Sequence, residues 1–148
     1  MVGARALVIS QDKDPGKKSG KNKVLLVYHT YCPGWHLPGG GVKRGEHPLQ
    51  AVRREVFEEA GIRCLKDPEF FGIYYQKYLG VDDYPTVYVI ESFTQESVRS
   101  PEIKESRWFP LDNLPSDIGF GSFQRIQEYL FKTPHPLAWG VSLKDKIQ

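Results

Sequence analysis

The chain has 148 residues and a mass of 16.9 kDa, the size of one ordinary globular domain, which excludes a large multidomain machine. Its 20 Lys and Arg against 18 Asp and Glu leave a formal net charge of +2. That basic excess is too small for a protein whose main partner is a nucleic acid. No apolar run approaches the roughly 20 residues that cross a bilayer, and residues 6–9 are too few for a signal-peptide core. We therefore expect one soluble, cytoplasmic domain over residues 1–148, with no membrane partner.

Two short β-rich runs open the chain, at 5–9 and 23–28. The segment between them, 11–22, is loaded with Lys, Asp, Gly and Pro, which predicts a hairpin with a long polar tip. Residues 30–45 then carry so many glycines and prolines that a continuous helix or a long central strand is excluded. We predict a shaped loop there.

A helix is predicted over residues 48–60, because Pro48 suits a first turn and Gly61 stands where a C′ glycine ends a helix. Its apolar residues recur at helical spacing, at Leu49, Val52, Val56 and Ala60. The later patterns predict strands at 70–78, 86–93 and 106–109, a helix at 123–131 and a C-terminal tail at 133–148. Mixed strands with two helices indicate an α/β or α+β sandwich.

The two cysteines, Cys32 and Cys64, could form at most one disulfide. Their spacing matches neither a metal knuckle nor a redox pair. Such residues are commonly buried free thiols in a reducing compartment, so we expect both to be free and buried.

Three carboxylates share one flank of the predicted helix. At about 100° per residue, Glu55, Glu58 and Glu59 fall in one sector beside the apolar stripe. Like charges at this spacing destabilise a helix by roughly a few tenths of a kcal/mol each, and Arg54 can offset only one of them. A hard divalent cation such as Mg²⁺ would remove the repulsion. A solvated acidic face is the alternative.

The segment just before the helix favours the metal. Residues 35–41 read WHLPGGG, and backbone with few side chains is needed where main-chain groups approach a metal or a phosphate closely. The glycine-rich loop leads directly into the acidic helix. The two features together indicate a metal or phosphate site more strongly than either does alone.

From residue 40 to residue 62 the chain reads GGVKRGEHPLQAVRREVFEEAGI, which resembles the Nudix box, G-x5-E-x7-R-E-U-x-E-E-x-G-U, without exception. The flanking residues 35–39 and 107–112 are also similar to this family. The fixed positions of the box fall at Gly40, Glu46, Arg54, Glu55, Glu58, Glu59 and Gly61, with Val56 and Ile62 at the two apolar places.

The resemblance implies an α-β-α sandwich with a mixed sheet and a hydrolase that splits the diphosphate linkage of a nucleoside diphosphate joined to another group. It implies Mg²⁺ as cofactor, with Mn²⁺ as a substitute. By position in the box, the metal ligands are Glu55, Glu58, Glu59 and the carbonyl of Gly40. Glu55 resembles the general base of some members, Arg54 an orienting partner, and Glu46 a residue that fixes the loop.

Four further residues are candidates outside the box. Many members add a later carboxylate, for which Glu102 and Glu105 qualify, although a surface glutamate is usually just solvated. His36 could contact a phosphate or simply bond the backbone. Tyr78, sixteen residues past the box, matches a tyrosine that accompanies dinucleoside polyphosphate substrates in the family, although aromatic residues at strand spacing are more often part of the core.

Two other functions and the oligomeric state stay open. A catalytically idle Nudix-fold module that binds a nucleotide for regulation is the alternative from another class, although such modules usually lose a box glutamate. Removal of 5′ caps from RNA shares the chemistry but predicts a basic track, which the near-neutral composition does not supply. A homodimer is compatible with the sequence.

Overall fold

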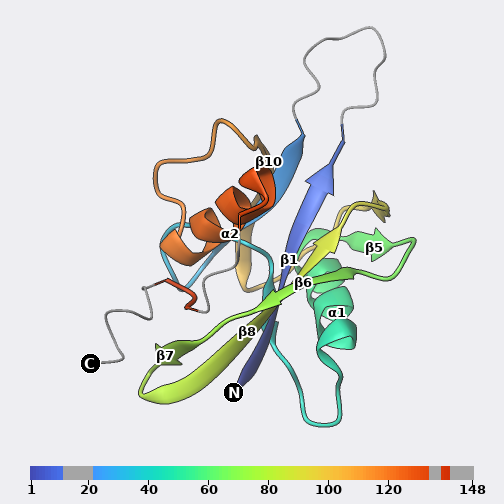
Figure 1. Ribbon diagram of the computed structural model, residues 1–148. Coiled ribbons are helices and arrows are strands. Elements are labelled where there is room, and N and C mark those ends of the chain that lie inside the picture. Colours follow the sequence, from blue (N-terminus) through green and yellow to red (C-terminus); the bar gives the residue numbers. More distant parts are fainter. Residues whose placement is uncertain (12–21, 134–137, 141–148) are drawn as a thin grey trace, which may run out of the picture.

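The computed structural model describes residues 1–11, 22–133 and 138–140 (Figure 1). The strands are β1 (Val2–Ser10), β2 (Lys23–His29), β3 (Trp35–His36), β4 (Gly39–Gly41), β5 (Ile62–Cys64), β6 (Glu69–Ile73), β7 (Gln76–Tyr78), β8 (Val81–Ile90), β9 (Phe93–Gln95) and β10 (Ile103–Pro110), and the helices are α1 (Pro48–Ala60) and α2 (Phe120–Phe131). An eight-stranded sheet runs β10-β2-β1-β8-β6, with β3 paired to β2, β4 to β1 and β7 to β8, while β5 and β9 form a second sheet. β1 and β8 are parallel and the other strand pairs are antiparallel, so the predicted mixed sheet is confirmed.

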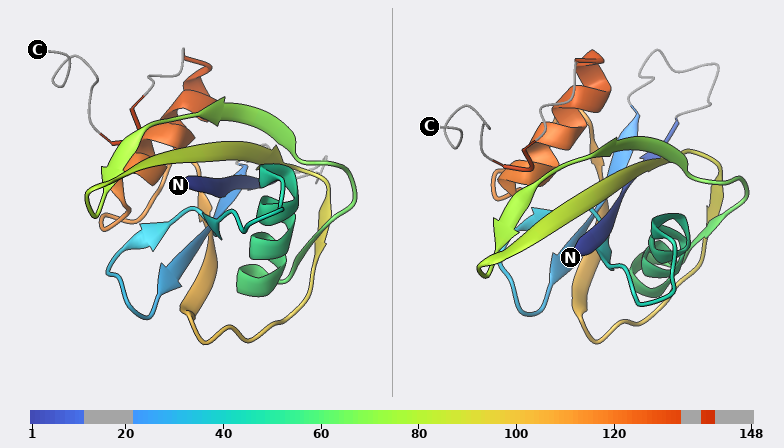
Figure 2. Two further views of the ribbon diagram at one scale, coloured as in Figure 1. Left: turned by 90° about the horizontal axis from the view of Figure 1, so that it is seen from below. Right: turned by 60° about the horizontal axis from the view of Figure 1, so that its bottom comes forward.

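The two helices cover opposite faces of the sheet. Val8 of β1 packs in one apolar cluster with Val52 of α1, whereas its neighbour Leu7 packs in another with Ile126 of α2. Consecutive side chains of a strand point to opposite faces, so the sheet lies between the helices, as Figures 1 and 2 show. The predicted α-β-α sandwich is confirmed.

The sheet splits where the candidate site lies. Among the described residues, β1 and β2 pair at Ile9 with Val24 and at Ser10 with Lys23 and at no other position. At the opposite ends of the two strands, β1 pairs with β4 through residues 3–5 and β2 pairs with β3 through residues 27–28. The glycine-rich segment therefore lies between β1 and β2 as two short strands. The expectation of a loop throughout 30–45 missed both strands. Residues 12–21 of the predicted hairpin tip lie outside the described residues.

Helix α1 has the ends that the sequence predicts. The ring of His47 caps it by accepting the amide of Leu49 at 3.0 Å, and the side chain of Gln50 accepts the amide of His47 at 2.9 Å. Gly61 ends the helix at a φ of +70°. A Cβ at this position would lie 1.9 Å from the carbonyl oxygen of Glu96, so only glycine fits the turn.

The later elements differ from the sequence expectation at their ends. The strand expected at 70–78 breaks at Tyr74 into β6 and β7. The amide of Tyr74 still donates to the carbonyl of Pro85 in β8 at 2.9 Å, but Pro85 has no N–H to return the hydrogen bond. The strand expected to start at residue 86 begins at 81 as β8, through Pro85. Helix α2 starts three residues earlier than expected, and β5 and β9 were not expected at all.

Of the expected tail, 133–148, only residues 133 and 138–140 are described beyond α2. Trp139 packs 5.9 Å from the ring of Tyr74, and its amide donates to the carbonyl of Tyr75 at 2.8 Å. Cys32 and Cys64 are free thiols, as predicted, but both are partly exposed rather than buried. Neither helix in the described part of the chain has the length and hydrophobicity needed to cross a bilayer.

Candidate active site

Helix α1 presents its acidic flank beside the glycine strand β4. The apolar residues of the helix are buried against the sheet, which fixes its rotation. Side-chain exposure falls from 53% for Glu58 to 14% for Glu55 and 5% for Glu59. The three carboxylates therefore lead from solvent into the protein interior.

Arg54 ties the box together. Its Nη1 donates to Oε1 of Glu55 at 2.8 Å and lies 3.4 Å from Oε2 of Glu58. Its Nε and Nη2 donate to the two carboxylate oxygens of Glu46, both at 2.9 Å, and Nη2 also reaches the carbonyl of Gly41 at 3.2 Å. The hydrogen bonds from Arg54 lower the pKa of Glu46 to about 2, so this carboxylate stays charged at neutral pH.

The backbone of β4 meets two of the carboxylates. The amide of Gly39 donates to Oε1 of Glu59 at 3.1 Å. A Cβ at Gly40 would lie 2.6 Å from Oε1 of Glu55, so a side chain at this position would push that carboxylate away. The glycines thus let the acidic helix approach the strand closely.

The carboxylate of Glu59 is buried, and one of its two oxygens lacks a hydrogen-bond partner among the described residues. Burial, and after it the negative charge of Glu55, raises the pKa of Glu59 to about 8. Its Oε2 has no hydrogen-bond partner among the described residues. The ring of His29 lies 3.9 Å from this oxygen, but burial and then the charge of Arg5 lower the pKa of His29 to about 4. The imidazole is therefore neutral near pH 7 and does not balance a carboxylate.

This donor set fits a hard divalent cation. Carboxylate and carbonyl oxygens are the ligands such cations prefer, and an oxygen buried without a partner gains most from one. In the part of the chain that the structure describes, no three His, Cys, Asp or Glu side chains are already grouped to hold a metal ion. Instead, Glu55 and Glu58 face the Arg54 guanidinium.

His36 lies beside this cluster, and Tyr78 does not. The ring centroid of His36 is 5.8 Å from that of His29, and its Nε2 lies 3.2 Å from the carbonyl oxygen of Pro33. Tyr78 is half exposed at the end of β7. The β7–β8 hairpin extends away from α1 in Figures 1 and 2, so the structure does not bring Tyr78 to the acidic helix.

The two later glutamates have different surroundings. The backbone carbonyl of Glu102 accepts the amide of Thr30, the residue after His29, at 2.9 Å. Burial, then the charges of Glu102 and Glu59, raise the pKa of Tyr31. Glu105 stands opposite Tyr28 in the β2–β10 register and pairs with Arg107. Tyr28 packs in the cluster on the α2 face, so Glu105 lies on the face away from the box.

Sequence reasoning missed two residues of the site, Arg5 and His29. Both lie on strands within otherwise apolar runs, and a charged or titratable side chain at such a position is the signal that could have found them. The guanidinium of Arg5 donates to the carbonyl of Gly39 at 3.2 Å. It thus reaches the same glycine that binds Glu59.

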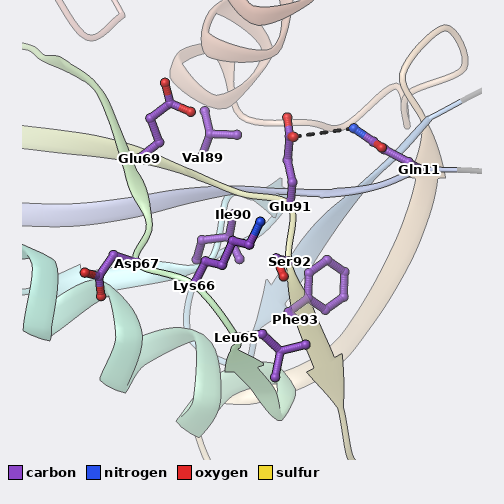
Figure 3. Close-up of a pocket in the computed structure, with 10 residues that line it drawn as sticks. All are labelled: Gln11, Leu65, Lys66, Asp67, Glu69, Val89, Ile90, Glu91, Ser92 and Phe93. Atoms are coloured by element: carbon purple, nitrogen blue, oxygen red, sulfur yellow. Dashed lines mark hydrogen bonds between the residues drawn. The ribbon is translucent and has the colours of Figure 1, made fainter.

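A cavity of about 450 Å³ opens elsewhere, between the ends of β6 and β8 and the segment after β5 (Figure 3). Its charged lining mixes Lys66 with Asp67, Glu69 and Glu91. Gln11 donates to Glu91 at 3.4 Å. None of the lining residues belongs to the box, so this cavity is separate from the candidate site.

The fold and this site define a class of protein, an α-β-α sandwich whose acidic helix follows a glycine strand. The family model described as NUDIX domain matches residues 3–129, and the chain belongs to the Nudix family.

Three similar proteins illustrate the match. A nucleoside triphosphate pyrophosphatase/Nudix hydrolase fusion protein of Bifidobacterium longum is 33% identical over 122 residues, which cover 77% of this chain and 24% of that protein. An RNA pyrophosphohydrolase of Bartonella henselae is 48% identical over 40 residues, 27% of this chain and 21% of that protein. The chain thus matches about a quarter or less of these relatives. The NUDIX domain of Shewanella oneidensis NrtR, complexed with ADP ribose, has a similar fold, with a TM-score of 0.73 and 19% identity over 89% of this chain and 87% of that one.

Proposed function

We propose that this chain hydrolyses the diphosphate linkage of a nucleoside diphosphate joined to another group, with Mg²⁺ as its cofactor. The observation that carries the proposal is Oε2 of Glu59, which is buried without a hydrogen-bond partner among the described residues, within an intact Nudix box. The hydrolase and pyrophosphohydrolase names of the relatives support the class of reaction. Mn²⁺ is expected to replace Mg²⁺, because both accept oxygen ligands.

Each residue of the box has a proposed role. The carboxylates of Glu55, Glu58 and Glu59, with the carbonyl of Gly40, would hold the cation. A bound divalent cation supplies neutralisation of the diphosphate charge and acidification of water. Glu55 is proposed to accept the proton of the attacking water, and Arg54 holds Glu55 in orientation through Nη1.

Outside the box, the geometry favours two of the four candidates. Glu102 is proposed as an additional carboxylate, since its charge acts on Tyr31 together with that of Glu59. His36 is proposed to line the substrate side, next to His29. Tyr78 and Glu105 have no such support.

A substrate panel tests the reaction. Nucleotide sugars, dinucleotides, dinucleoside polyphosphates and oxidised nucleoside triphosphates are each incubated with Mg²⁺, and phosphate is measured with and without a coupled phosphatase. We expect a nucleoside monophosphate and a phosphorylated second product from at least one class. Failure of every class with Mg²⁺ and with Mn²⁺ would refute the proposal.

The idle module is a second candidate, because the structurally similar NrtR domain is complexed with ADP ribose. In that case a nucleotide would raise the melting temperature without being cleaved. All box glutamates are present here, which favours the hydrolase.

RNA is a further candidate substrate, because one relative is named an RNA pyrophosphohydrolase. That match covers 40 residues, and the net charge of +2 supplies no strong attraction for a polyanion. A short RNA with a 5′ triphosphate therefore belongs in the panel, and we expect slower cleavage of it than of small nucleotides.

We also propose that the protein acts in the cytoplasm, where its two free thiols would remain reduced. A homodimer stays a proposal, and sedimentation at two protein concentrations tests it.

A further inference from the structure

Two arginines bind the carbonyls of the glycine strand, and they differ in what else they contact. Arg54 donates to Gly41 and uses its remaining nitrogens on Glu46 and Glu55. Arg5 of β1 donates from Nη1 to the carbonyl of Gly39 at 3.2 Å. Among the described residues, the side chain of Arg5 forms no other hydrogen bond and no ion pair. A guanidinium has five N–H donors, so most of those on Arg5 are unused.

Gly39 fixes the course of the Arg5 side chain. The two residues are partners in the β1–β4 register. A Cβ at Gly39 would lie 2.9 Å from Cδ of Arg5 and 2.0 Å from the carbonyl oxygen of Ala4. The aliphatic stem of Arg5 therefore lies across the glycine, and only glycine leaves it that room.

The side chains of Arg5 and Glu59 thus bind the two polar backbone atoms of one residue, Gly39. Glu59 accepts from the amide of Gly39 at 3.1 Å, while Arg5 donates to its carbonyl. The charge of Arg5 acts on the same cluster, because after burial it is the next cause that lowers the pKa of His29. Burial lowers the pKa of His36 as well, so both imidazoles are neutral near pH 7.

The unused N–H donors of Arg5 are open to solvent, because none of its nitrogens is among the buried atoms that lack a partner, so a ligand can reach them. The planar guanidinium fork matches two oxygens of a phosphate or a carboxylate. We propose that Arg5 binds phosphoryl oxygens of the substrate diphosphate, beside the cation held by the carboxylates. This inference rests on the proposed function of the same site.

Binding of imidodiphosphate, whose P–N–P bridge replaces P–O–P, tests the inference without turnover. Its affinity is measured by calorimetry with saturating Mg²⁺ for the parent, Arg5→Met and Arg5→Lys. We expect a loss of about 10- to 100-fold for Arg5→Met, the range of one charge-assisted contact, and a smaller loss for Arg5→Lys, which keeps the charge but not the fork. Arg63→Met is the matched control. The exposed guanidinium of Arg63 pairs with Glu96, lies over the ring of Phe57 and, among the described residues, forms no hydrogen bond or ion pair with the three box carboxylates or the glycine strand.

A second measurement separates substrate binding from a merely structural role. Mn²⁺ binding, followed by electron paramagnetic resonance, should stay within about twofold of the parent in Arg5→Met, because Arg5 is not a metal ligand. Loss of Mn²⁺ and imidodiphosphate affinity by the same factor would show that Arg5 only shapes the Gly39 backbone, and would overturn the inference. An unchanged imidodiphosphate affinity would overturn it too.

The remaining outcomes are also decisive. Should Arg5→Met unfold, Arg5→Lys decides, because loss of the fork must still weaken imidodiphosphate binding, and parental affinity in this variant would refute two-point contact. If the parent hydrolyses nothing in the substrate panel, the proposed function fails. The role of Arg5 in diphosphate binding is still decided by calorimetry.

Discussion

Arg54 and Glu46 form a two-point ion pair, with Nε 2.9 Å from Oε2 and Nη2 2.9 Å from Oε1. Both side chains are mostly shielded from solvent, with exposures of 21% and 16%. Such parallel hydrogen bonds fix orientation as well as distance. The pair therefore anchors the segment before α1 to the helix and leaves Nη1 free to hold Glu55.

Glu46→Gln is expected to destabilise the protein at pH 7, because the charged pair is lost. The pKa of Glu46 is lowered from 4.5 to about 2 in the folded protein, so its stabilising contribution is present above pH 4.5 and disappears as the pH falls toward 2. The difference in unfolding free energy between parent and variant should therefore shrink below pH 4.5. Urea titrations between pH 7 and pH 2.5 measure it, with the exposed Glu69→Gln as control. A difference that does not change with pH would contradict the ion pair.

Glu59→Gln and Glu58→Gln should each lower turnover by several orders of magnitude while the fold is retained, because each removes a charged ligand of the proposed cation. Circular dichroism checks the fold and the substrate panel checks turnover. Near-parental turnover in either variant would refute the metal assignment.

The same Glu59→Gln variant should be more stable than the parent when metal is chelated at alkaline pH. Folding raises the pKa of Glu59 from 4.5 to about 8, so ionisation of this buried group costs stability that grows between those values and is complete above pH 8. Thermal unfolding in EDTA at pH 5 and pH 9 should show the advantage of the variant only at pH 9. An advantage of equal size at both values would argue against the raised pKa.

Chelation is expected to abolish hydrolysis, and added Mg²⁺ or Mn²⁺ should restore it. Binding to the folded state alone also raises the melting temperature, so Mg²⁺ should stabilise the parent but not Glu59→Gln. Full activity in excess chelator would point to a mechanism without a divalent cation.

Ser122→Ala is expected to destabilise the protein by about 1–3 kcal/mol, the cost of a buried donor left without its acceptor. The hydroxyl of Ser122 accepts the amide of Leu37 at 3.0 Å, and both residues are buried. Urea unfolding measures the loss, with the exposed Ser106→Ala as control. A cost no greater than that of the control would show that water replaces the hydroxyl.

The sequence predicted α1 to the residue because its end signals are local. Pro48 and Gly61 act within one turn of the helix, whereas β5 and β9 exist through pairing of Ile62 with Gln95, more than thirty positions along the chain. A three-residue strand carries too little pattern to indicate such a partner.

Part of the site was predictable for a similar reason. The three glutamates and Arg54 recur at helical spacing in one short stretch. Arg5 belongs to the site only because β1 carries it across Gly39, a contact between distant segments that no spacing in the sequence reveals. Glu105 was a candidate for the later carboxylate of the family, but its register with Tyr28 turns it to the other face.

The parallel pairing of β1 with β8 has a consequence for synthesis on the ribosome. Ala4 stands beside Thr86, so β1 waits for its partner until more than eighty further residues have left the exit tunnel after it. The acidic helix lies between them in the chain and emerges while its sheet is still open. Closure of such a distant pair is slow, and the nascent chain therefore exposes its carboxylates and the apolar face of β1 until β8 arrives.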